Sequence, residues 1–335
     1  MKAIAMMQPG TPEVLNVMDV PQPTLTQDNQ LLIRLHAAGV NPIDTKLRNR
    51  GPLIGDPAPT ILGCDGAGVV EAVGDRVTDF QPGDEVYYCF GGLGQTGTGN
   101  YAAYAVVEDH YVAPKPKTLS FSEAAAAPLV LITAWEALYD RGRLSEGQTA
   151  LIHAGAGGVG HVAIQLAKLK GARVCTTVGN PDKARLARQL GADETILYKQ
   201  VNFAEAALKW TDGQGVDLAF DTVGGNTFFA SFDAVRIYGD IVTLLEPDYS
   251  VGNLKVARKR NQRIGLELML TPMLAGLRDA QKYHGDILRQ CSTWFEEGKL
   301  TLHLSQKYPL AEAAAAHTAI EQGSMTGKVA LKIAE

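Results

Sequence analysis

A glycine-rich loop between a predicted strand and a predicted helix constrains the fold of this chain more than any other feature. The loop is Gly155-Ala156-Gly157-Gly158-Val159-Gly160, which follows a strand predicted over residues 149–154 and opens a helix predicted over residues 159–169. In such a loop the first glycine permits a tight turn, the second lets the backbone approach a pyrophosphate, and the third lets the helix pack on the strand. The amides at the start of the helix also attract an anion. The loop therefore predicts a dinucleotide site, and a flexible glycine turn is the alternative.

Apolar runs and amphipathic segments alternate from this loop onward. Strands are predicted over residues 149–154, 172–178, 195–198, 216–222 and 241–245. Helices are predicted over residues 159–169, 183–190, 203–210 and 226–236. Alternation at this spacing is typical of a parallel sheet with helices on both faces. The predicted fold class is therefore α/β, with a doubly wound parallel sheet.

The two ends of the chain have a different character. The N-terminal third predicts strands over residues 31–36, 68–73 and 85–89, an exposed loop over residues 91–100, and a helix over residues 122–138 that is capped by Ser122. The C-terminal part predicts a helix, a strand, a helix and a strand over residues 285–298, 302–308, 311–320 and 328–333.

Composition limits the classes of protein that this chain can be. Its 335 residues predict about two domains. A net charge of −5 makes a nucleic-acid partner unlikely, because a nucleic-acid surface needs a clustered positive excess. The start lacks a secretory signal pattern, no run is long enough to span a membrane, and four cysteines do not make a disulfide framework. We therefore expect a soluble, cytoplasmic protein.

The turn after the second strand of the alternating region bears on the choice between NAD and NADP. An acidic residue about 20 positions beyond the loop normally binds the ribose 2′-hydroxyl of NAD. This chain has Gly179 and Asn180 there, followed by Lys183, so there is room for a 2′-phosphate and a cation to neutralise it. The turn favours NADPH, with Lys183 as an ordinary surface lysine of a helix as the alternative.

Several motifs in the same order give the chain a family resemblance. They are residues 39–44 (GVNPID), 63–74 (GCDGAGVVEAVG), 80–86 (FQPGDEV), the glycine loop, 221–225 (DTVGG) and 327–329 (GKV). With these motifs the chain resembles the zinc-independent quinone oxidoreductase branch of the medium-chain dehydrogenase/reductase superfamily. The resemblance implies a GroES-like catalytic domain of residues 1–122 and 265–335, a Rossmann NADP-binding domain of residues 123–264 inserted into it, and a homodimer or tetramer.

The resemblance also bears on metal binding. Zinc-dependent members carry a cysteine in place of Asn41, a His-Glu pair in place of Cys64-Asp65, and a further cysteine near Leu129. An amide oxygen is a poor zinc ligand and leucine is none, so no metal site is predicted. A soft metal held by Cys64 with Asp65 or Cys89 is the alternative to a buried structural cysteine.

The resemblance assigns roles to particular residues. It implies that Asn41 and Asp44 face the nicotinamide, with Asn41 donating to the oxygen of the acceptor and Asp44 orienting that group or relaying a proton. Ordinary turn chemistry is the alternative for both residues. The other implied cofactor contacts are Thr133 near the nicotinamide, Tyr198 beside the 2′-phosphate, and the backbone at Leu244 and Leu245.

Hydride addition to a conjugated acceptor needs less electrophilic help than alcohol oxidation, because the developing charge spreads over the acceptor. The chain is therefore expected to be an NADPH-dependent reductase of quinones or α,β-unsaturated carbonyls. One alternative is a zinc-type alcohol dehydrogenase with a metal at Cys64. The other is a non-enzymatic NADPH-binding protein, for which the basic run over residues 255–263 is the support; that run is otherwise expected to be a solvated loop or helix face.

Overall fold

The computed structural model describes residues 1–55, 58–95 and 98–334, and the chain forms two compact units. One unit combines Met1–Leu129 with Leu270–Glu335, and the other is Val130–Met269. The first unit is therefore built from two stretches that flank the second unit in the sequence. None of the helices in the described ranges combines the length and the apolar character needed to cross a membrane.

Six parallel strands form the sheet of the unit Val130–Met269. They are β9 (Thr149–Ile152), β10 (Arg173–Val178), β11 (Glu194–Leu197), β12 (Val216–Asp221), β13 (Val235–Thr243) and β14 (Arg263–Leu266). Their order in the sheet is β11-β10-β9-β12-β13-β14, and every neighbouring pair is parallel. The direction of strand addition reverses beside β9, as in a doubly wound nucleotide-binding sheet. The predicted α/β class with a Rossmann sheet is confirmed.

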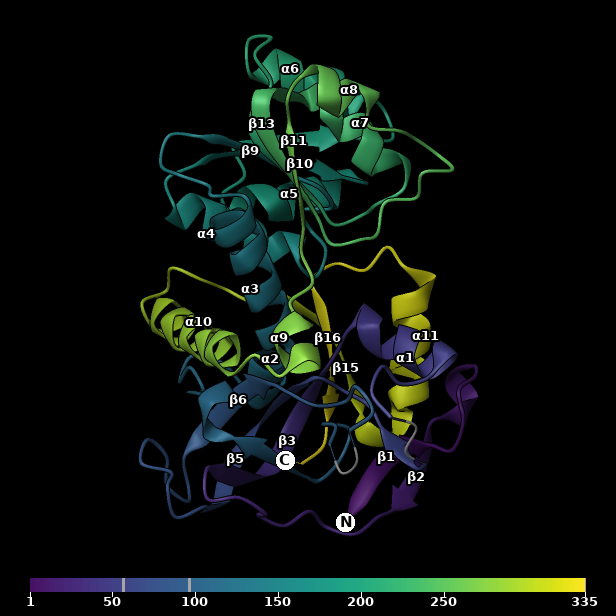
Figure 1. The fold of residues 1–335 in the computed structure, drawn as a ribbon, viewed down its shortest axis with the longest axis vertical. Coiled ribbons are helices and arrows are strands. Elements are labelled where there is room, and N and C mark those ends of the chain that lie inside the picture. The colour runs from purple at the N-terminus through teal and green to yellow at the C-terminus, as the bar shows by residue number, and fades with distance from the viewer. Residues whose placement is uncertain (56–57, 96–97, 335) are drawn as a thin grey trace. The chain divides into compact units, whose positions relative to one another are not determined.

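Helices cover both faces of this sheet. They are α4 (Gly160–Leu169), α5 (Pro181–Gln189), α6 (Phe203–Trp210), α7 (Asn226–Ala234) and α8 (Lys255–Lys259). Figure 1 shows α4 and α5 on one side of the strands and α6, α7 and α8 on the other. On the α7 side, Phe228 and Phe232 pack with Leu151, Cys175 and Ile241 of the strands. Burial of the sheet on both faces explains why its strands are nearly continuous apolar runs.

A seven-stranded sheet and a three-stranded sheet build the other unit. The larger sheet contains β3 (Gln30–Val40), β5 (Asp65–Val73), β6 (Glu85–Cys89), β7 (Tyr104–Glu108), β8 (Val112–Pro114), β15 (Leu304–Pro309) and β16 (Lys328–Lys332). Its order is β15-β16-β3-β5-β6-β8, and β7 also pairs with β3. The smaller sheet has the order β2-β1-β4, with β1 (Lys2–Met6), β2 (Asn16–Asp19) and β4 (Thr60–Ile61).

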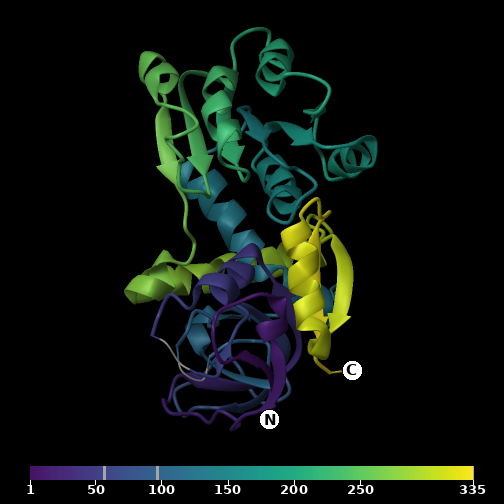
Figure 2. The ribbon, with the colours of Figure 1, turned by 90° about the vertical axis from the view of Figure 1, so that its right-hand side faces the viewer.

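The last strand of the chain pairs with one of the first. In β16, Val329 lies opposite Val40 of β3 in an antiparallel ladder. Figure 2 shows this C-terminal segment in yellow, with α11 (Ala313–Gln322) beside it. The pairing brings Lys328 next to the end of β3, where α1 (Pro42–Arg50) begins.

The structure contains four further α-helices, a π-helical segment and short 3₁₀ turns in the described residues. They are α2 (Phe121–Ala126), α3 (Pro128–Trp135), α9 (Thr271–Ala275) and α10 (Arg278–Glu296), together with a π-helical segment Glu136–Arg141 and single 3₁₀ turns at Pro12–Val14, Asp109–Tyr111 and Leu310–Glu312. The predicted helix over residues 285–298 therefore starts earlier than expected, at Arg278.

The predicted helix over residues 122–138 is wrong in its cap and in its continuity. Ser120, and not Ser122, is the N-cap: its Oγ accepts from the backbone N–H of Glu123, and the Glu123 carboxylate accepts from the N–H of Ser120 at 2.9 Å. Helix α2 ends at Ala126 and α3 begins at Pro128, because proline lacks an N–H and fits only the first turn of a helix.

The loop over residues 91–100 was predicted to be exposed, and this prediction is wrong for most of the residues that the structure describes there. Residues 96–97 lie outside the described residues. Residues 91–94 are buried, and a Cβ at Gly92 would lie 2.6 Å from the carbonyl oxygen of Gly63. Asn100 is buried and donates to that same oxygen at 2.9 Å. The glycines here allow a close approach of two backbone segments rather than a solvent-exposed loop.

The basic run over residues 255–263 agrees in part with the expected helix face. Lys255, Arg258 and Lys259 are exposed on or beside α8, but Arg263 starts the unpredicted strand β14. The guanidinium of Arg263 pairs with the carboxylate of Asp240, with Nη2 and Oδ2 2.8 Å apart. Part of the positive charge is therefore paired within the sheet.

Candidate functional site

The glycine loop is less crowded at one of its glycines than at two others. A Cβ at Gly155 would lie 2.0 Å from Oγ1 of Thr176, and a Cβ at Gly160 would lie 2.3 Å from the carbonyl oxygen of Ala154. At Gly157 the nearest atom is that same oxygen at 3.1 Å, and only Ala154 comes within 4 Å. Packing therefore requires glycine at positions 155 and 160, whereas a Cβ at Gly157 would meet only Ala154, in a tight contact.

The rest of the loop suits an anion. Gly158 and Val159 are partly exposed and directly precede α4, in whose first turn the backbone N–H of His161 donates to the carbonyl oxygen of Gly157 at 3.1 Å. The ring Nδ1 of His161 lies 3.0 Å from the carbonyl oxygen of Gly157 and holds that turn in place. The pyrophosphate of a dinucleotide fits this cradle, since it takes up backbone N–H groups at a helix start.

The turn between β10 and α5 brings the residues predicted for a 2′-phosphate together. A Cβ at Gly179 would lie 3.5 Å from the hydroxyl oxygen of Tyr198 and 3.8 Å from Cε of Lys199. Asn180 caps α5, with its Oδ1 accepting from the N–H of Lys183 at 2.9 Å. Tyr198 is half exposed at the end of β11. These side chains border one spot next to Gly179.

Two ammonium groups influence each other at this spot. Burial lowers the pKa of Lys183, and the charge of Lys199 lowers it further. A bound phosphate would relieve the repulsion between the two cations. Lys199 was not among the residues predicted from sequence. Its position directly after Tyr198, a predicted contact of the 2′-phosphate, could have identified it.

The segment with Leu244 and Leu245 is held by a buried carboxylate. Oδ2 of Asp221 accepts from the hydroxyl of Thr243 at 2.9 Å, and the carbonyl oxygen of Asp221 accepts from the N–H of Leu244 at 3.1 Å. The N–H of Leu245 donates to Oγ1 of Thr243 at 3.2 Å. The backbone at these leucines is thus fixed at the carboxyl end of β13, where parallel sheets bind ligands. Thr133 is buried in α3.

Asn41 and Asp44 belong to the other unit, where they join a buried polar cluster. The Nδ2 of Asn41 donates to Oδ2 of Asp65 at 2.9 Å, and its Oδ1 accepts a hydrogen bond from the ammonium of Lys328. Lys328 also donates to the carbonyl oxygen of Val40 at 3.2 Å. Asn41 and Asp65 are fully buried, and Lys328 is 3% exposed. Both ends of the Asn41 carboxamide are therefore held by charged groups.

Asp44 is the second carboxyl group of this cluster. Its Oδ2 accepts from the backbone N–H of Asn41 at 2.8 Å and from the hydroxyl of Tyr101 at 3.1 Å, and the thiol of Cys64 lies 3.9 Å from its Oδ1. The Tyr101 oxygen is 3.1 Å from Nε2 of His317. Burial, with a smaller contribution from the Asp65 carboxylate, raises the pKa of Asp44 to about 7. Asp44 thus caps α1 from within the helix, which is the turn-type role, and also contacts the side chains of Tyr101 and Cys64.

The residues at the positions of the zinc ligands do not fit a zinc ion. The amide oxygen of Asn41 is occupied by an ammonium group, and Oδ1 of Asp65 accepts from the backbone N–H of Leu129 at 2.9 Å. Burial raises the pKa of the Cys64 thiol well above its ordinary value, so this side chain is not a thiolate. Within the described ranges, no group of three or more histidine, cysteine, aspartate or glutamate side chains is arranged to hold a metal ion.

Lys328 and Tyr101 are the members of the cluster that the sequence did not reveal. Lys328 lies in the quoted segment GKV at residues 327–329, so its place in a motif was a signal for a role. Burial lowers the pKa of Lys328, whereas the carboxyl groups of Asp65 and Asp44 raise it. Tyr101 lies close to the stretch that was predicted to be an exposed loop, and that error hid it.

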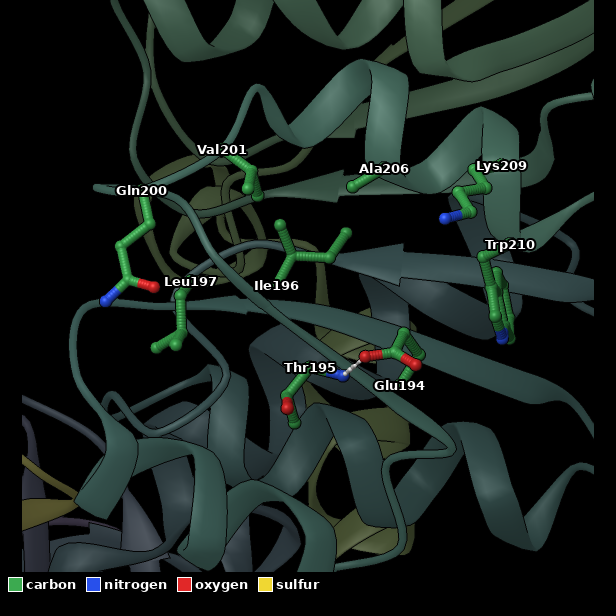
Figure 3. A pocket seen from close by; sticks show the side chains of 9 residues that line it. All are labelled: Glu194, Thr195, Ile196, Leu197, Gln200, Val201, Ala206, Lys209 and Trp210. Carbon is green, nitrogen blue, oxygen red and sulfur yellow. Dashed lines mark hydrogen bonds between the residues drawn. The ribbon is translucent and has the colours of Figure 1, made fainter.

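A cavity of about 470 Å³ lies in the unit Val130–Met269, hereafter the Rossmann unit, along the edge strand β11 and helix α6. Figure 3 shows its lining, in which the side chain of Glu194 accepts from the N–H of Thr195 at 2.8 Å and Trp210 stands at the end of α6. None of the predicted site residues lines this cavity. We assign it no part in the reaction.

Comparison with protein families places known domains on both parts of the chain. Residues 27–117 match the alcohol dehydrogenase GroES-like domain, and residues 190–331 match the zinc-binding dehydrogenase family. Among curated proteins, a quinone oxidoreductase of Pseudomonas aeruginosa is 35% identical over 96% of both chains. A 2-methylene-furan-3-one reductase of Solanum lycopersicum is 34% identical over 99% of this chain and 79% of that protein.

Solved structures show the same fold over the full length. The Escherichia coli quinone oxidoreductase complexed with NADPH aligns with a TM-score of 0.84 and 28% identity, over 99% of this chain and 100% of that one. An NAD-dependent alcohol dehydrogenase aligns with a TM-score of 0.89 and 34% identity, over the same shares of both chains. The relatives therefore include both chemistries that the sequence left open.

Proposed function

Because this chain belongs to the quinone oxidoreductase branch of the medium-chain dehydrogenase/reductase superfamily, we propose that it transfers a hydride from NADPH to a quinone or an α,β-unsaturated carbonyl. The similarity to the Pseudomonas aeruginosa quinone oxidoreductase supports this, since it spans 96% of both chains. So does the similarity to a reductase named for a conjugated ketone. NADPH, when bound, supplies the hydride.

The unit Val130–Met269 supplies the contacts that we propose for the cofactor. The partly exposed backbone at Gly157, with Gly155, Gly158, Val159 and Gly160 around it, receives the pyrophosphate. The spot next to Gly179 takes the 2′-phosphate, with Asn180, Lys183 and Tyr198 as predicted and Lys199 added. Thr133 and the fixed backbone at Leu244 and Leu245 orient the nicotinamide.

Asn41 is the proposed hydrogen-bond donor to the acceptor. One hydrogen of its Nδ2 is used by Asp65, and the other has no partner in the part of the chain that the structure describes. We assign this second hydrogen to the acceptor oxygen that becomes negative during hydride transfer. Asn41 has no exposed surface here, so the proposal requires neighbouring side chains to move when an acceptor binds. Asp44 holds the backbone of Asn41 and is the proposed link for a proton.

The observation that carries this choice of acceptor is the chemistry of the donor set around Asn41. An amide, an ammonium, carboxylates with bound N–H groups and a protonated thiol offer hydrogen bonds but no zinc ligand set. Such groups suffice for an acceptor that spreads the developing charge by conjugation. They give no comparable support to a saturated alcohol, which is the substrate class of the zinc-type alternative.

Two further assignments are part of the proposal. A homodimer is supported by the edge strand β14, because Leu266, Leu268, Ile237 and Tyr238 at this end of the sheet are all more than half exposed. A cytoplasmic location is consistent with four cysteines that are all unpaired.

An acceptor screen with the purified protein tests the proposed function. NADPH oxidation is followed with a quinone, an enone, an enal and a saturated aldehyde. We expect turnover with the conjugated acceptors and little with the saturated aldehyde. Tight NADPH binding without oxidation by any acceptor would favour the non-enzymatic alternative, and a preference for the saturated aldehyde would favour the alcohol dehydrogenase alternative.

A further inference from the structure

We propose that Lys328 is a positioning residue for the reaction: a buried ammonium group that orients and polarises the carboxamide of Asn41. The inference rests on the proposed function, because it concerns how Asn41 is prepared to meet an acceptor. It adds a residue from the far end of the chain to the site.

The first step is the orientation of the amide. The two ends of a carboxamide have nearly the same shape, so hydrogen-bond partners decide which end is oxygen and which is nitrogen. Lys328 has only hydrogens to donate and therefore selects the oxygen, while the Asp65 carboxylate accepts and therefore selects the nitrogen. The two charged partners exclude the flipped amide, in which an ammonium would face an NH₂ group. The nitrogen of Asn41, and with it the second hydrogen, is thus fixed in place.

The second step is the location of the ammonium. Lys328 is almost fully buried, which is unfavourable for a charge unless it is paired and hydrogen-bonded. The groups that compensate it are the carbonyl oxygen of Val40, the oxygen of Asn41, and the nearby carboxyls of Asp65 and Asp44. A methionine or leucine would fill the same volume without this cost. The buried ammonium group of Lys328 therefore has a specific effect that an apolar side chain would lack, which is its hydrogen bond to the side chain of Asn41.

The third step is polarisation. A hydrogen bond from a charged donor to the amide oxygen draws electron density toward that oxygen and makes the N–H groups stronger donors. The second hydrogen on Nδ2 of Asn41 is then a better partner for an oxygen that gains negative charge. Lys328 thus supplies, through Asn41, the positive charge that a metal ion supplies directly in a zinc site.

A double-mutant cycle tests this role, with an enone as acceptor and saturating NADPH. Lys328→Met is measured in the unmodified protein and in Asn41→Ala. If Lys328 acts through Asn41, we expect Lys328→Met to lower kcat at least about tenfold in the unmodified protein. In Asn41→Ala, the same substitution should lower kcat less than about twofold. The affinity for NADPH should stay the same, so the loss should be in kcat.

The matched control is Lys115→Met. Lys115 is also a buried lysine of the first unit, but its Nζ donates to the carbonyl oxygen of Leu119 at 2.7 Å and lies 3.1 Å from Glu85, with no contact to the Asn41 cluster. This variant should lose thermal stability and keep kcat. If Lys328→Met does not yield folded protein, the same cycle is run with Lys328→Gln, whose neutral amide still donates to Asn41 and should give an intermediate loss.

The outcomes separate the two proposals. Equal losses from Lys328→Met with and without the Asn41 side chain, in an active enzyme, would overturn the positioning role and leave the proposed function intact. Unmodified protein that reduces no conjugated acceptor would overturn the proposed function, and the role of Lys328 with it.

Discussion

The ammonium of Lys328 donates a hydrogen bond to the side-chain oxygen of Asn41, although 287 positions separate the two residues in the sequence. The contact depends on the pairing of β16 with β3, which joins the C-terminal stretch to the N-terminal one. The candidate catalytic residues of the first unit are therefore completed by the last strand of the chain. A truncation before β16 would remove both a strand and the partner of Asn41.

The glycine loop predicts different outcomes for two neighbouring substitutions. Gly157→Ala places a methyl group 3.1 Å from the carbonyl oxygen of Ala154, a milder clash than at Gly160, so NADPH affinity should fall at least about tenfold while the unit stays folded. Gly160→Ala places a methyl group 2.3 Å from a backbone oxygen, so it should lower the free energy of unfolding by about 1–3 kcal/mol. Calorimetric titration and thermal unfolding distinguish these effects. Unchanged NADPH affinity in folded Gly157→Ala would refute the proposed pyrophosphate cradle.

Replacing a cation next to Gly179 should change the cofactor preference. Lys183→Glu puts a negative charge where the 2′-phosphate is proposed to bind, so the ratio of NADH to NADPH dissociation constants should fall roughly tenfold or more. Lys199→Glu should act in the same direction. Lys209→Glu makes the same charge change in α6, away from this spot, and should leave the ratio as it is. A preference for NADPH that survives both Lys183→Glu and Lys199→Glu would contradict the assignment.

The Rossmann unit was largely predictable from sequence, and the reason lies in its packing. A strand that is buried on both faces, such as β9, appears in the sequence as a run of apolar residues. The helices of the unit are amphipathic, so in both kinds of element the local sequence pattern agrees with the tertiary environment. The prediction of residues 203–210 coincides with α6. The loop over residues 91–100 failed because glycine is used both in exposed turns and where backbones touch, and composition does not separate the two uses.

Removing the side chain of Asn41 should affect turnover more than cofactor binding. In Asn41→Ala the acceptor oxygen loses its proposed donor, so kcat should fall by about 10²-fold while the dissociation constant of NADPH changes little. The substitution also leaves the Lys328 ammonium without one partner, so some loss of thermal stability is expected. Full activity of Asn41→Ala would remove this residue from the mechanism.

A buried carboxyl pair in the Rossmann unit predicts how stability depends on pH. Burial, with a contribution from Glu136, raises the pKa of Glu267 to about 8 from an ordinary value of 4.5, although Arg141 lies 3.1 Å away. The folded state thus binds more protons than the unfolded state between these values. The contribution of Glu267 to the stability of the folded state is therefore complete below about pH 4.5 and is lost as the pH rises through about 8.

Glu267→Gln isolates this effect, because the substituted side chain does not ionise. The variant should gain stability relative to the unmodified protein at about pH 9, on the order of a few kcal/mol, and little at about pH 5. Thermal unfolding at both pH values measures the difference. His153, whose pKa burial lowers to about 4, affects both proteins equally and cancels in the comparison. An equal stability change at both pH values would contradict the raised pKa.

The cluster around Asn41 was only partly predictable. The motifs place Asn41, Asp44, Cys64 and Asp65 in the sequence, but a pattern of residue types does not say which oxygen faces which hydrogen. The place of Lys328 depends on the register of β16 against β3, which is a tertiary property. The sequence therefore predicted the members of the site better than their contacts.

Isotope transfer tests the central claim most directly. Protein treated with a chelator is given an enone and NADPH that carries two deuterium atoms at C4 of the nicotinamide, and the product is examined by mass spectrometry. We predict one deuterium at the β-carbon for each NADPH oxidised, at a rate that the chelator does not change. An unlabelled product, or a reaction that stops until zinc is restored, would contradict hydride transfer that relies on the amide of Asn41.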